Sequence, residues 1–498
     1  MKFDERNLRW VILALCAVAA LRVFVFAAAF PFFNNVDEQA HVDLVIKYLH
    51  AKPPHGIEPF SSEAARYFTL YSSPEYFLTS EQLAAEDLAP AWTLTGDVRE
   101  KIVSAAIPVW ESRPNHESGE PPLYYAIAGA WMNLGRALGL DGLTLLYWVR
   151  FLNVVFAALL VWIGFVVARS TFPESRFVQL GIAALLALWP QSAFYSTQAD
   201  ALSPICFGVA FLGLTKILLN ARAGILVAIW TGLAMAATCL TKTSNLSLPI
   251  AAVIVLAAKI IAVERKQSLR QALLTFAVFL ISFAIPTSFW FVSNYQRFGD
   301  LTATKSKIEL LGWTIKPITA WLPHPLLSLH GLREFWPELS ASFWRGEFVW
   351  HLQRLASPFA DNFYAIVTAL VIFIAVVLLL RRQARGEDPQ FVLWLALLSF
   401  LSIVALLVIL SLRFDFGQCP YPSREHPYFT SGRLLNAAAI PFFLLFVYVI
   451  DRIADWLKRD WLRWVLLGAT IVIVLVSQLQ TNAPAFASRY NFFHRKAL

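Results

Sequence analysis

Two adjacent carboxylates open the most informative stretch of the chain. Asp37 and Glu38 follow directly on the first long apolar run, and His41 lies one helical turn past Asp37. Acidic side chains are costly to place beside lipid, so their presence at the end of an apolar run indicates function. Because adjacent acids in a half-buried site repel, we expect one to have a raised pKa and the other to stay ionised. Such a pair suits removal of a proton from a hydroxyl near neutral pH.

The same stretch also fits a purely structural role. The residues that follow place apolar side chains on one face of an amphipathic helix, namely Val42, Val45, Ile46 and Leu49. Asp37 would then cap this helix through its side-chain oxygen. The residues alone leave both interpretations open, and both can hold at once.

A second polar stretch lies at residues 115–120 and is followed by two prolines and two tyrosines. The prolines break any preceding helix, and the aromatic side chains after them suit a membrane interface. His116, Glu120 and Tyr124 are candidate substrate-binding residues. The alternative is that the stretch only anchors the chain at the interface.

Cationic side chains recur near the ends of apolar runs, on the same face as the two polar stretches. The candidates are Lys242, Arg297, Arg345 and Arg433. Arg433 lies where the positive-inside rule does not favour a basic residue. Fixed cations beside a bilayer suit a phosphate headgroup. Each of them can instead be a long side chain that reaches from a helix end to the interface.

The composition excludes a soluble protein. Of the 498 residues, 58% are hydrophobic and 15% are charged, whereas soluble proteins carry roughly 25% charged residues. The 40 Phe, 18 Trp and 14 Tyr exclude a disordered chain. Four scattered cysteines indicate neither a disulfide framework nor a zinc site. The net charge of +8 is spread over the ends of apolar runs, which favours membrane orientation and argues against a nucleic-acid partner.

The charge pattern predicts the topology. If the apolar run at 121–140 crosses the membrane, the first basic cluster falls on the opposite side from all the later ones. If it does not cross, every basic cluster lies on one face, which is the arrangement expected of cytoplasmic loops. We therefore interpret 121–140 as a surface or re-entrant helix. The prediction is an all-α polytopic protein with about 11 transmembrane helices, its N-terminus inside and its C-terminus outside.

This topology gathers the polar residues on the outer face. The outer loops are predicted at 32–143, 294–358 and 413–431, and all 9 histidines fall in them or in the C-terminal tail. No internal repeat is visible, so we expect residues 1–498 to form a single membrane domain. The first apolar run is long enough to span and stay, so no cleaved signal peptide is expected.

Taken together, the motifs resemble those of a known group of enzymes. Asp37-Glu38-x-x-His41 is similar to the acidic first-loop motif of protein O-mannosyltransferases and bacterial lipid-linked-sugar transferases. The segment 121–125 resembles their "HPPLYY" segment, although His116 lies further upstream and Glu120 stands next to the prolines. Further similar segments follow in the same order at 150–153, 198–200, 240–242 and 431–435. The nearest resemblance is to uncharacterised bacterial relatives with a "DExxH" first loop.

The resemblance implies the GT-C fold of integral membrane glycosyltransferases. In such enzymes a sugar carried on a polyprenyl phosphate is presented at the outer leaflet, and an acid of the first loop activates the acceptor hydroxyl. By position, Asp37 is the expected general base, with Glu38 and His41 as its catalytic partners. The acceptor would be a glycan, a lipid or a protein, and the expected location is the bacterial inner membrane with the active site facing outside.

The resemblance also implies a set of substrate-binding residues. Arg433, with Lys242 or Arg345, would hold the lipid phosphate. The complete set comprises His116, Glu120, Tyr124, Lys242, Arg297, Arg345 and Arg433. No cofactor is required, and the chain has no nucleotide-binding G-x-x-x-x-G-K-[ST] loop. A divalent cation held by Asp37, Glu38 and Glu120 ranks below the metal-free interpretation.

Two other functions remain open at this point. A transporter or flippase for a lipid-linked saccharide would carry ionisable residues at mid-membrane depth and internal repeats. Here mid-span charges are few, Arg22 being the clearest, and the acids cluster at one face. A catalytically inactive assembly subunit that keeps the GT-C fold is the third hypothesis.

Overall fold

The computed structural model describes residues 5–34, 37–220, 224–262, 266–381, 389–419 and 421–494. Within them, nine helical spans are long and apolar enough to cross a membrane. The helices of these spans are α1 (Glu5–Ala29), α7 (Gly142–Arg150) with α8 (Leu152–Thr171), α10 (Ser203–Leu219), α12 (Leu248–Ile261), α13 (Lys266–Phe298), α16 (Pro358–Leu380), α17 (Gln390–Arg413), α18 (Ala439–Trp456) and α19 (Asp460–Ala487). Two shorter apolar helices are α9 (Arg176–Leu188) and α11 (Ile225–Cys239). The expected all-α polytopic class is confirmed, and the number of spans stays a prediction.

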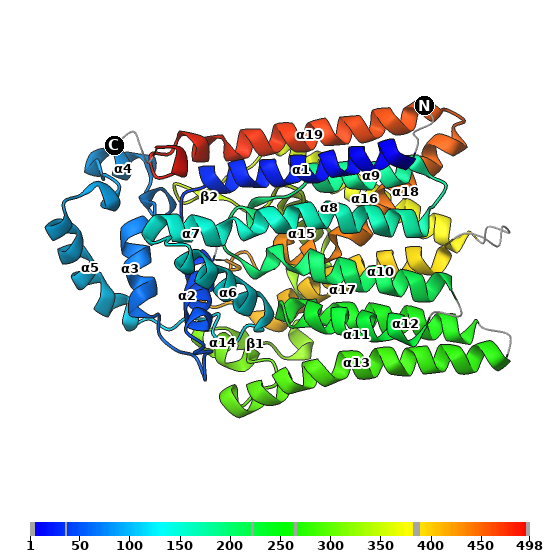
Figure 1. Cartoon of the computed structure of the whole chain (residues 1–498), viewed down its shortest axis with the longest axis horizontal. Coiled ribbons are helices and arrows are strands. Elements are labelled where there is room, and N and C mark those ends of the chain that lie inside the picture. Colours follow the sequence, from blue (N-terminus) through cyan, green and yellow to red (C-terminus); the bar gives the residue numbers. More distant parts are fainter. Residues whose placement is uncertain are drawn as a thin grey trace.

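The long helices lie side by side along one direction, and a smaller group of helices lies beyond one end of them (Figure 1). We call this end the site end. The smaller group comprises α2 (Glu38–Leu49), α3 (Ser62–Tyr71), α4 (Ser80–Glu86), α5 (Gly96–Glu111) and α6 (Leu123–Ala137). Helix α6 corresponds to the run at 121–140; it packs on α2 and α7 and is not among the spans. Its Arg136 pairs with Glu63 of α3.

The first residues of the loop expected at 294–358 belong to α13, which continues to Phe298. Two helices follow, α14 (Thr304–Leu310) and α15 (Leu329–Arg345). The strands are short antiparallel pairs, β1 (Thr314–Ile315) with β4 (Phe414–Asp415) and β2 (Val349–Trp350) with β3 (Gln353–Arg354). The remaining turns are 3-10 helices: η1 (Pro74–Tyr76), η2 (Ala91–Thr93), η3 (Ser192–Phe194), η4 (Ala199–Ala201), η5 (Thr243–Ser247), η6 (Ile318–Ala320), η7 (Pro325–Leu327), η8 (Gly432–Ala438) and η9 (Phe492–His494).

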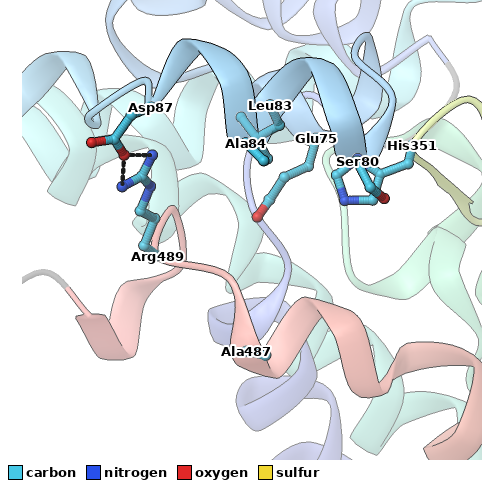
Figure 2. A pocket seen from close by; sticks show the side chains of 8 residues that line it. All are labelled: Glu75, Ser80, Leu83, Ala84, Asp87, His351, Ala487 and Arg489. Atoms are coloured by element: carbon cyan, nitrogen blue, oxygen red, sulfur yellow. Dashed lines mark hydrogen bonds and ion pairs between the residues drawn. The ribbon is translucent and has the colours of Figure 1, made fainter.

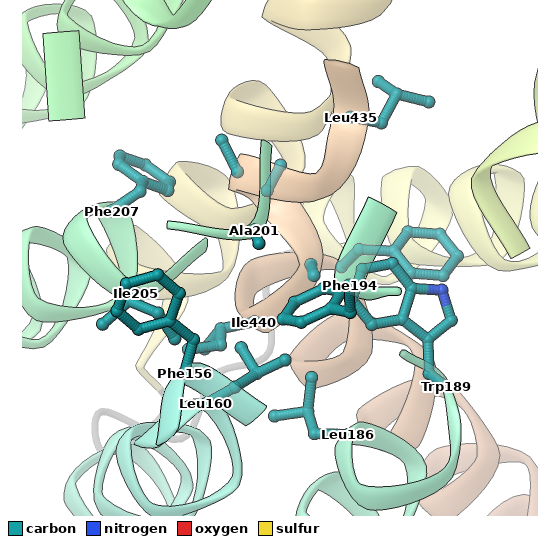
Figure 3. Close-up of a cluster of buried hydrophobic side chains, with 14 of the residues drawn as sticks. Phe156, Leu160, Leu186, Trp189, Phe194, Ala201, Ile205, Phe207, Leu435 and Ile440 are labelled. Carbon is teal, nitrogen blue, oxygen red and sulfur yellow. The ribbon is translucent and has the colours of Figure 1, made fainter. Parts of the chain in front are cut away.

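Helix α18 lies at the centre of the bundle. Its span is 94% buried, whereas that of α13 is 17% buried. A helix that is apolar on all sides belongs in such a core. Around it, aromatic and aliphatic side chains interdigitate from several helices, among them Phe156, Trp189 and Ile440 (Figure 3). The η8 turn, which carries Arg433, leads directly into this rigid helix.

Basic residues gather at the end of the bundle away from the site end. Arg169 and Arg176 flank the turn between α8 and α9, and both pair with Glu5 at the start of α1. Arg463 lies in the first turn of α19 and pairs with Asp451 near the end of α18. Other basic residues that the sequence places here lie outside the described residues: Lys2, Arg222, Arg265, Arg382 and Arg385.

Candidate active site

Six titratable side chains meet at the site end, and we call them the site cluster. They are Asp37, His116, Glu117, Glu120, Lys307 and Arg433. They come from the start of α2, the loop between α5 and α6, helix α14 and the η8 turn. Opposite charges alternate along the cluster, so each carboxylate has a cationic neighbour within direct contact.

Asp37 is held at its carboxylate from two sides. Arg433 Nη2 donates a hydrogen bond of 2.6 Å to Asp37 Oδ2, and His116 Nε2 lies 3.2 Å from Asp37 Oδ1. Asp37 stands at the N-cap of α2 with φ 65°, and its side chain makes no capping hydrogen bond. The alternative in which the Asp37 side chain caps α2 is therefore wrong, because this side chain turns toward Arg433 and His116 instead. Its left-handed backbone is one that Asp tolerates better than most residues.

Glu117 continues the cluster away from Asp37. His116 Nε2 lies 3.3 Å from Glu117 Oε1, and Lys307 Nζ donates to the same oxygen at 2.8 Å. Lys307 Nζ also lies 3.4 Å from Glu120 Oε1. The other oxygen of Glu120 is buried without a hydrogen-bond partner in the described chain.

Two glycines allow the close backbone approaches that position these cations. A side chain at Gly432 would collide with the backbone of Phe343, and the Gly432 N–H donates to Ser342 Oγ at 2.7 Å. This contact fixes the residue before Arg433. A side chain at Gly119 would collide with Ala303, the N-cap residue of α14. Glycine at 119 therefore lets α14 approach closely enough for Lys307 to reach the cluster.

The charges determine which groups are protonated. Burial alone would raise the pKa of Asp37, but Arg433 and His116 outweigh it and hold that pKa well below its usual range. The same balance holds the pKa of Glu117 well below its usual value, with Lys307 and His116 as the counter-charges. Both carboxylates are therefore ionised at neutral pH.

The neighbouring groups shift the other way. Burial lowers the pKa of His116, yet its hydrogen bonds to Asp37 and Glu117 raise it to about 10, so the ring is an imidazolium at neutral pH. Burial raises the pKa of Glu120 more than Lys307 lowers it. Within the site cluster the carboxyl with a raised pKa is therefore Glu120, and Asp37 stays ionised.

Glu38 faces away from Asp37. It is fully buried, and Arg150 Nη2 donates to its two oxygens at 2.7 and 2.9 Å. The backbone N–H groups of Phe33 and Thr197 donate to the same carboxylate at 2.8 and 2.9 Å. These contacts with described residues are structural, because they tie the end of α1 to α7 and to the loop after η3.

His41 lies behind the cluster on the next turn of α2. It is 1% exposed, and its Nδ1 lies 2.7 Å from the hydroxyl of Tyr125. Burial, together with the nearby Lys242, lowers the pKa of His41 to about 4, so the ring is neutral at pH 7. Tyr124 is buried as well, with its ring 5.5 Å from that of Tyr125. These three side chains form one wall behind Asp37.

The remaining predicted cations have partners outside the cluster. Lys242 Nζ donates to Asp200 Oδ2 at 2.5 Å. Arg345 forms a two-point ion pair with Asp361 at 2.7 and 3.0 Å. Arg297 Nη1 donates to the carbonyl of Pro54 at 3.1 Å. Of the four, only Arg433 contacts Asp37 directly.

Three groups of the cluster have the donor set of a metal site. Single ligand atoms of Asp37, His116 and Glu117 lie within 4.8 Å of one another, and imidazole and carboxylate together suit a divalent transition metal. In the structure the His116 imidazolium occupies the position between the two carboxylates, so a metal would have to displace its proton. Of the acids expected to bind a cation, only Asp37 belongs to this group, because Glu38 binds Arg150 and Glu120 neighbours Lys307.

Sequence reasoning missed Glu117 and Lys307. Glu117 directly follows His116, so the position of His116 in the candidate site was a signal that could have identified Glu117. Lys307 lies in an ordinary amphipathic stretch far from the other members, and no sequence pattern marks it. Arg150, which binds Glu38, was noted in the sequence only as the first residue of the segment 150–153, which resembles a segment of the lipid-linked-sugar transferases.

A pocket lies elsewhere at the site end. It is an open pocket of about 430 Å³ between α4, the hairpin of β2 and β3, and the end of α19 (Figure 2). Its lining includes Glu75, His351 and the ion pair of Asp87 with Arg489. No member of the site cluster lines this pocket.

Comparisons with solved structures return archaeal proteins. The chain is similar to the oligosaccharyltransferase AglB from Archaeoglobus fulgidus in complex with an inhibitory peptide and a dolichol-phosphate, at 11% identity and a TM-score of 0.49, covering 96% of this chain and 56% of that one. For the Archaeoglobus fulgidus oligosaccharyltransferase in complex with Zn and sulfate the identity is 13% and the TM-score 0.47, covering 94% of this chain and 53% of that one. The chain thus spans little more than half the length of these proteins.

A family model matches most of the sequence. No curated protein matches the chain. Residues 21–418, which include most of the site cluster, match the model described as "Predicted membrane protein (DUF2142)". The chain therefore belongs to the DUF2142 family of membrane proteins.

Proposed function

We propose that the chain is a GT-C-type glycosyltransferase that moves a sugar from a polyprenyl phosphate to an acceptor hydroxyl. The observation that carries this proposal is the direct contact of Asp37 with Arg433 and His116 in one half-buried cluster. An acid that can accept a proton is therefore in direct contact with a cation that can bind a phosphate. The order of motifs in the sequence, which resembles lipid-phosphate-sugar transferases, supports the same conclusion.

The reaction needs two events at neighbouring atoms. The acceptor oxygen forms a bond to the anomeric carbon of the sugar as the bond from that carbon to the phosphate oxygen breaks. The acceptor's proton passes to Asp37, and the electron pair of the broken bond leaves on the polyprenyl phosphate. The protein's task is therefore to position the acceptor, accept one proton and neutralise the phosphate.

The pairing of Asp37 with Arg433 makes Asp37 a weak base while no phosphate is bound. A donor phosphate that binds Arg433 shares its charge, so Arg433 stabilises the Asp37 carboxylate less. The pKa of Asp37 then rises, and the acid becomes a better proton acceptor only when donor is in place. Donor binding and base activation are coupled through one guanidinium.

The other groups have supporting roles in this scheme. His116, an imidazolium at neutral pH, keeps the Asp37 carboxylate oriented and adds positive charge on the donor side. Lys307 balances Glu117 and Glu120, so the cluster tolerates the incoming phosphate. Lys242 and Arg345 pair with Asp200 and Asp361, which lie outside the site cluster, whereas Arg433 pairs with Asp37 itself, so we assign the phosphate to Arg433.

Binding of the product lipid tests the proposal without knowledge of the sugar. The full chain in lipid nanodiscs is titrated with undecaprenyl phosphate, and binding is followed by native mass spectrometry. Arg433→Ala should weaken binding by at least about tenfold, the loss of a charge-assisted phosphate contact. The matched control is Arg424→Ala, which removes an exposed arginine that pairs with Asp415. Equal affinity in the Arg433 variant and the control would refute the assignment.

We propose further that the site end faces outward from a bacterial inner membrane. The basic residues at the opposite end of the bundle support this orientation. A cysteine in place of Asp97 in α5 should react with an impermeant reagent in intact cells, and one in place of Glu174 between α8 and α9 should not. The reverse labelling pattern would overturn the orientation.

A further inference from the structure

Residues 311–329 carry far fewer charged side chains than the small helices α2–α6, which form the polar layer at the site end. The sequence of this segment is LGWTIKPITAWLPHPLLSL, with no acidic residue, one lysine and one histidine. Helices α4 and α5 at the same end carry exposed charges such as Glu86 and Asp97. A stretch of this composition is unusual for a loop in water.

The segment exposes large aliphatic side chains. Ile318 is 77% exposed, Leu322 81% and Leu329 67%. These fractions match those of side chains on the outer surface of the spanning helices, such as Phe289 of α13 at 74%. The further exposed members of the segment are Ile315 and Leu327. Large exposed aliphatic side chains repeated along one short segment mark a contact with lipid or protein.

The two titratable side chains of the segment turn inward. Lys316 Nζ donates to the carbonyl of Ser411 at 3.2 Å. His324 is 6% exposed, its Nδ1 accepts the N–H of Leu326, and burial together with Lys316 lowers its pKa to about 4. The exposed side of the segment is therefore left without charge at neutral pH.

Both flanks of the segment are bonded to candidate spanning helices. On one side β1 pairs with β4, directly after α17, and the Lys316 N–H donates to the carbonyl of Arg413, the last residue of that span. On the other side Trp336 Nε1 donates to the carbonyl of Ala365 at 2.9 Å. Ala365 lies well inside α16, about 10 Å of helix rise from its start at Pro358.

We propose that the exposed part of this segment, residues 315–329, lies at the membrane interface and inserts into the headgroup region of the leaflet at the site end. The exposed aliphatic side chains sit where the bundle's lipid-facing surface meets its polar layer, so lipid is the occupant that continues the existing surface. The long outer loop expected at 294–358 is then partly a membrane-bound element. This inference does not depend on the proposed function.

The segment also lies next to α14 in the chain. α14 ends at Leu310, and its Lys307 reaches Glu117 and Glu120. An anchored segment therefore holds Lys307 at the level of the membrane surface.

Depth-dependent quenching tests the inference in the intact protein. The four native cysteines, Cys16, Cys206, Cys239 and Cys419, are replaced by alanine in the full chain, and single cysteines replace Ile318 or Leu322. Each is labelled with the fluorophore NBD, and the protein is placed in phosphatidylcholine vesicles with a doxyl group at acyl carbon 5 or 12. Reference positions are Asp97→Cys in α5 and Phe373→Cys in α16.

NBD at 318 and 322 should be quenched at least twofold more than at 97, and more by the shallow doxyl group than by the deep one. At 373 the deep doxyl group should also quench. Quenching at 318 and 322 no greater than at 97 would overturn the inference. Protection from aqueous iodide without doxyl quenching would overturn it too, because it would show that protein, such as a second copy of the chain, covers the segment.

Discussion

Asp37 and Arg433 lie 396 positions apart in the chain, and Arg433 Nη2 donates a hydrogen bond of 2.6 Å to Asp37 Oδ2. The pair connects two parts of the structure. Asp37 belongs to the group of small helices α2–α6 at the site end, and Arg433 lies in the turn that leads into α18, the most buried span of the bundle. A rigid core helix therefore fixes the cation, while the acid is carried by the polar layer. Any ligand that binds one member changes the charge environment of the other.

Asp37→Asn should lower turnover by at least about 100-fold, the usual contribution of a general base. The melting temperature should fall as well, because the substitution removes the counter-charge of Arg433 and His116, so turnover is compared per folded protein. The measurement is release of polyprenyl phosphate from a panel of polyprenyl-phosphate pentoses, hexoses and aminosugars, with the melting temperature recorded in parallel. Asp97→Asn is the control, and unchanged turnover in the Asp37 variant would remove it as the base.

Glu38→Gln should act on folding instead. Breaking a buried ion pair leaves Arg150 charged and unpaired at a fully buried site, which costs about 3 kcal/mol. The melting temperature in detergent should therefore fall by several degrees, and the exposed control Glu86→Gln should leave it unchanged. Arg150→Met added to Glu38→Gln should recover part of the loss. A Glu38 variant with normal stability and lost turnover would instead place Glu38 in the chemistry.

The sequence allowed most of the fold to be predicted, for a physical reason. A helix that crosses lipid must satisfy its backbone internally and be apolar over about 20 residues, so the spans are visible in the residues themselves. The interpretation of 121–140 as a surface or re-entrant helix stays a prediction; in the structure this run forms the short helix α6, which packs on α2. The loop boundary at 293 stays a prediction, because α13 continues as one helix to Phe298 and hydropathy does not report where such a helix leaves the membrane.

The candidate site was only partly predictable, because its pairings are set by tertiary packing. The sequence placed Asp37, His116 and Arg433 in one candidate site, and the structure brings them into contact. It gave no means of separating Asp37 from Glu38, which are adjacent in the chain yet face Arg433 and Arg150 respectively. The two side chains are separated by the left-handed backbone conformation of Asp37. An aspartate at the start of a helical pattern does not predict that conformation.

The stability of the protein should fall as the pH rises from about 7 to 10. The folded-state pKa of His116 is raised to about 10, and the unfolded value is about 6.5. A group with a raised folded pKa contributes stability that is complete below the unfolded pKa and is lost as the pH rises through the folded one. Melting temperature measured across this range should show the decline in the wild type. His116→Gln should flatten it, and an equal decline in that variant would assign the effect to another group.

Divalent metal should compete with the His116 proton. A metal at the position between Asp37 and Glu117 needs a neutral imidazole, so Mn²⁺ binding should release a proton and tighten by about tenfold per pH unit from pH 7 toward 10. Calorimetry in two buffers with different ionisation enthalpies measures both quantities. His116→Gln should bind Mn²⁺ without this pH dependence, and a wild-type affinity that is constant with pH would contradict the arrangement. Because the imidazolium already supplies a cation at pH 7, sugar transfer at that pH should survive treatment with EDTA.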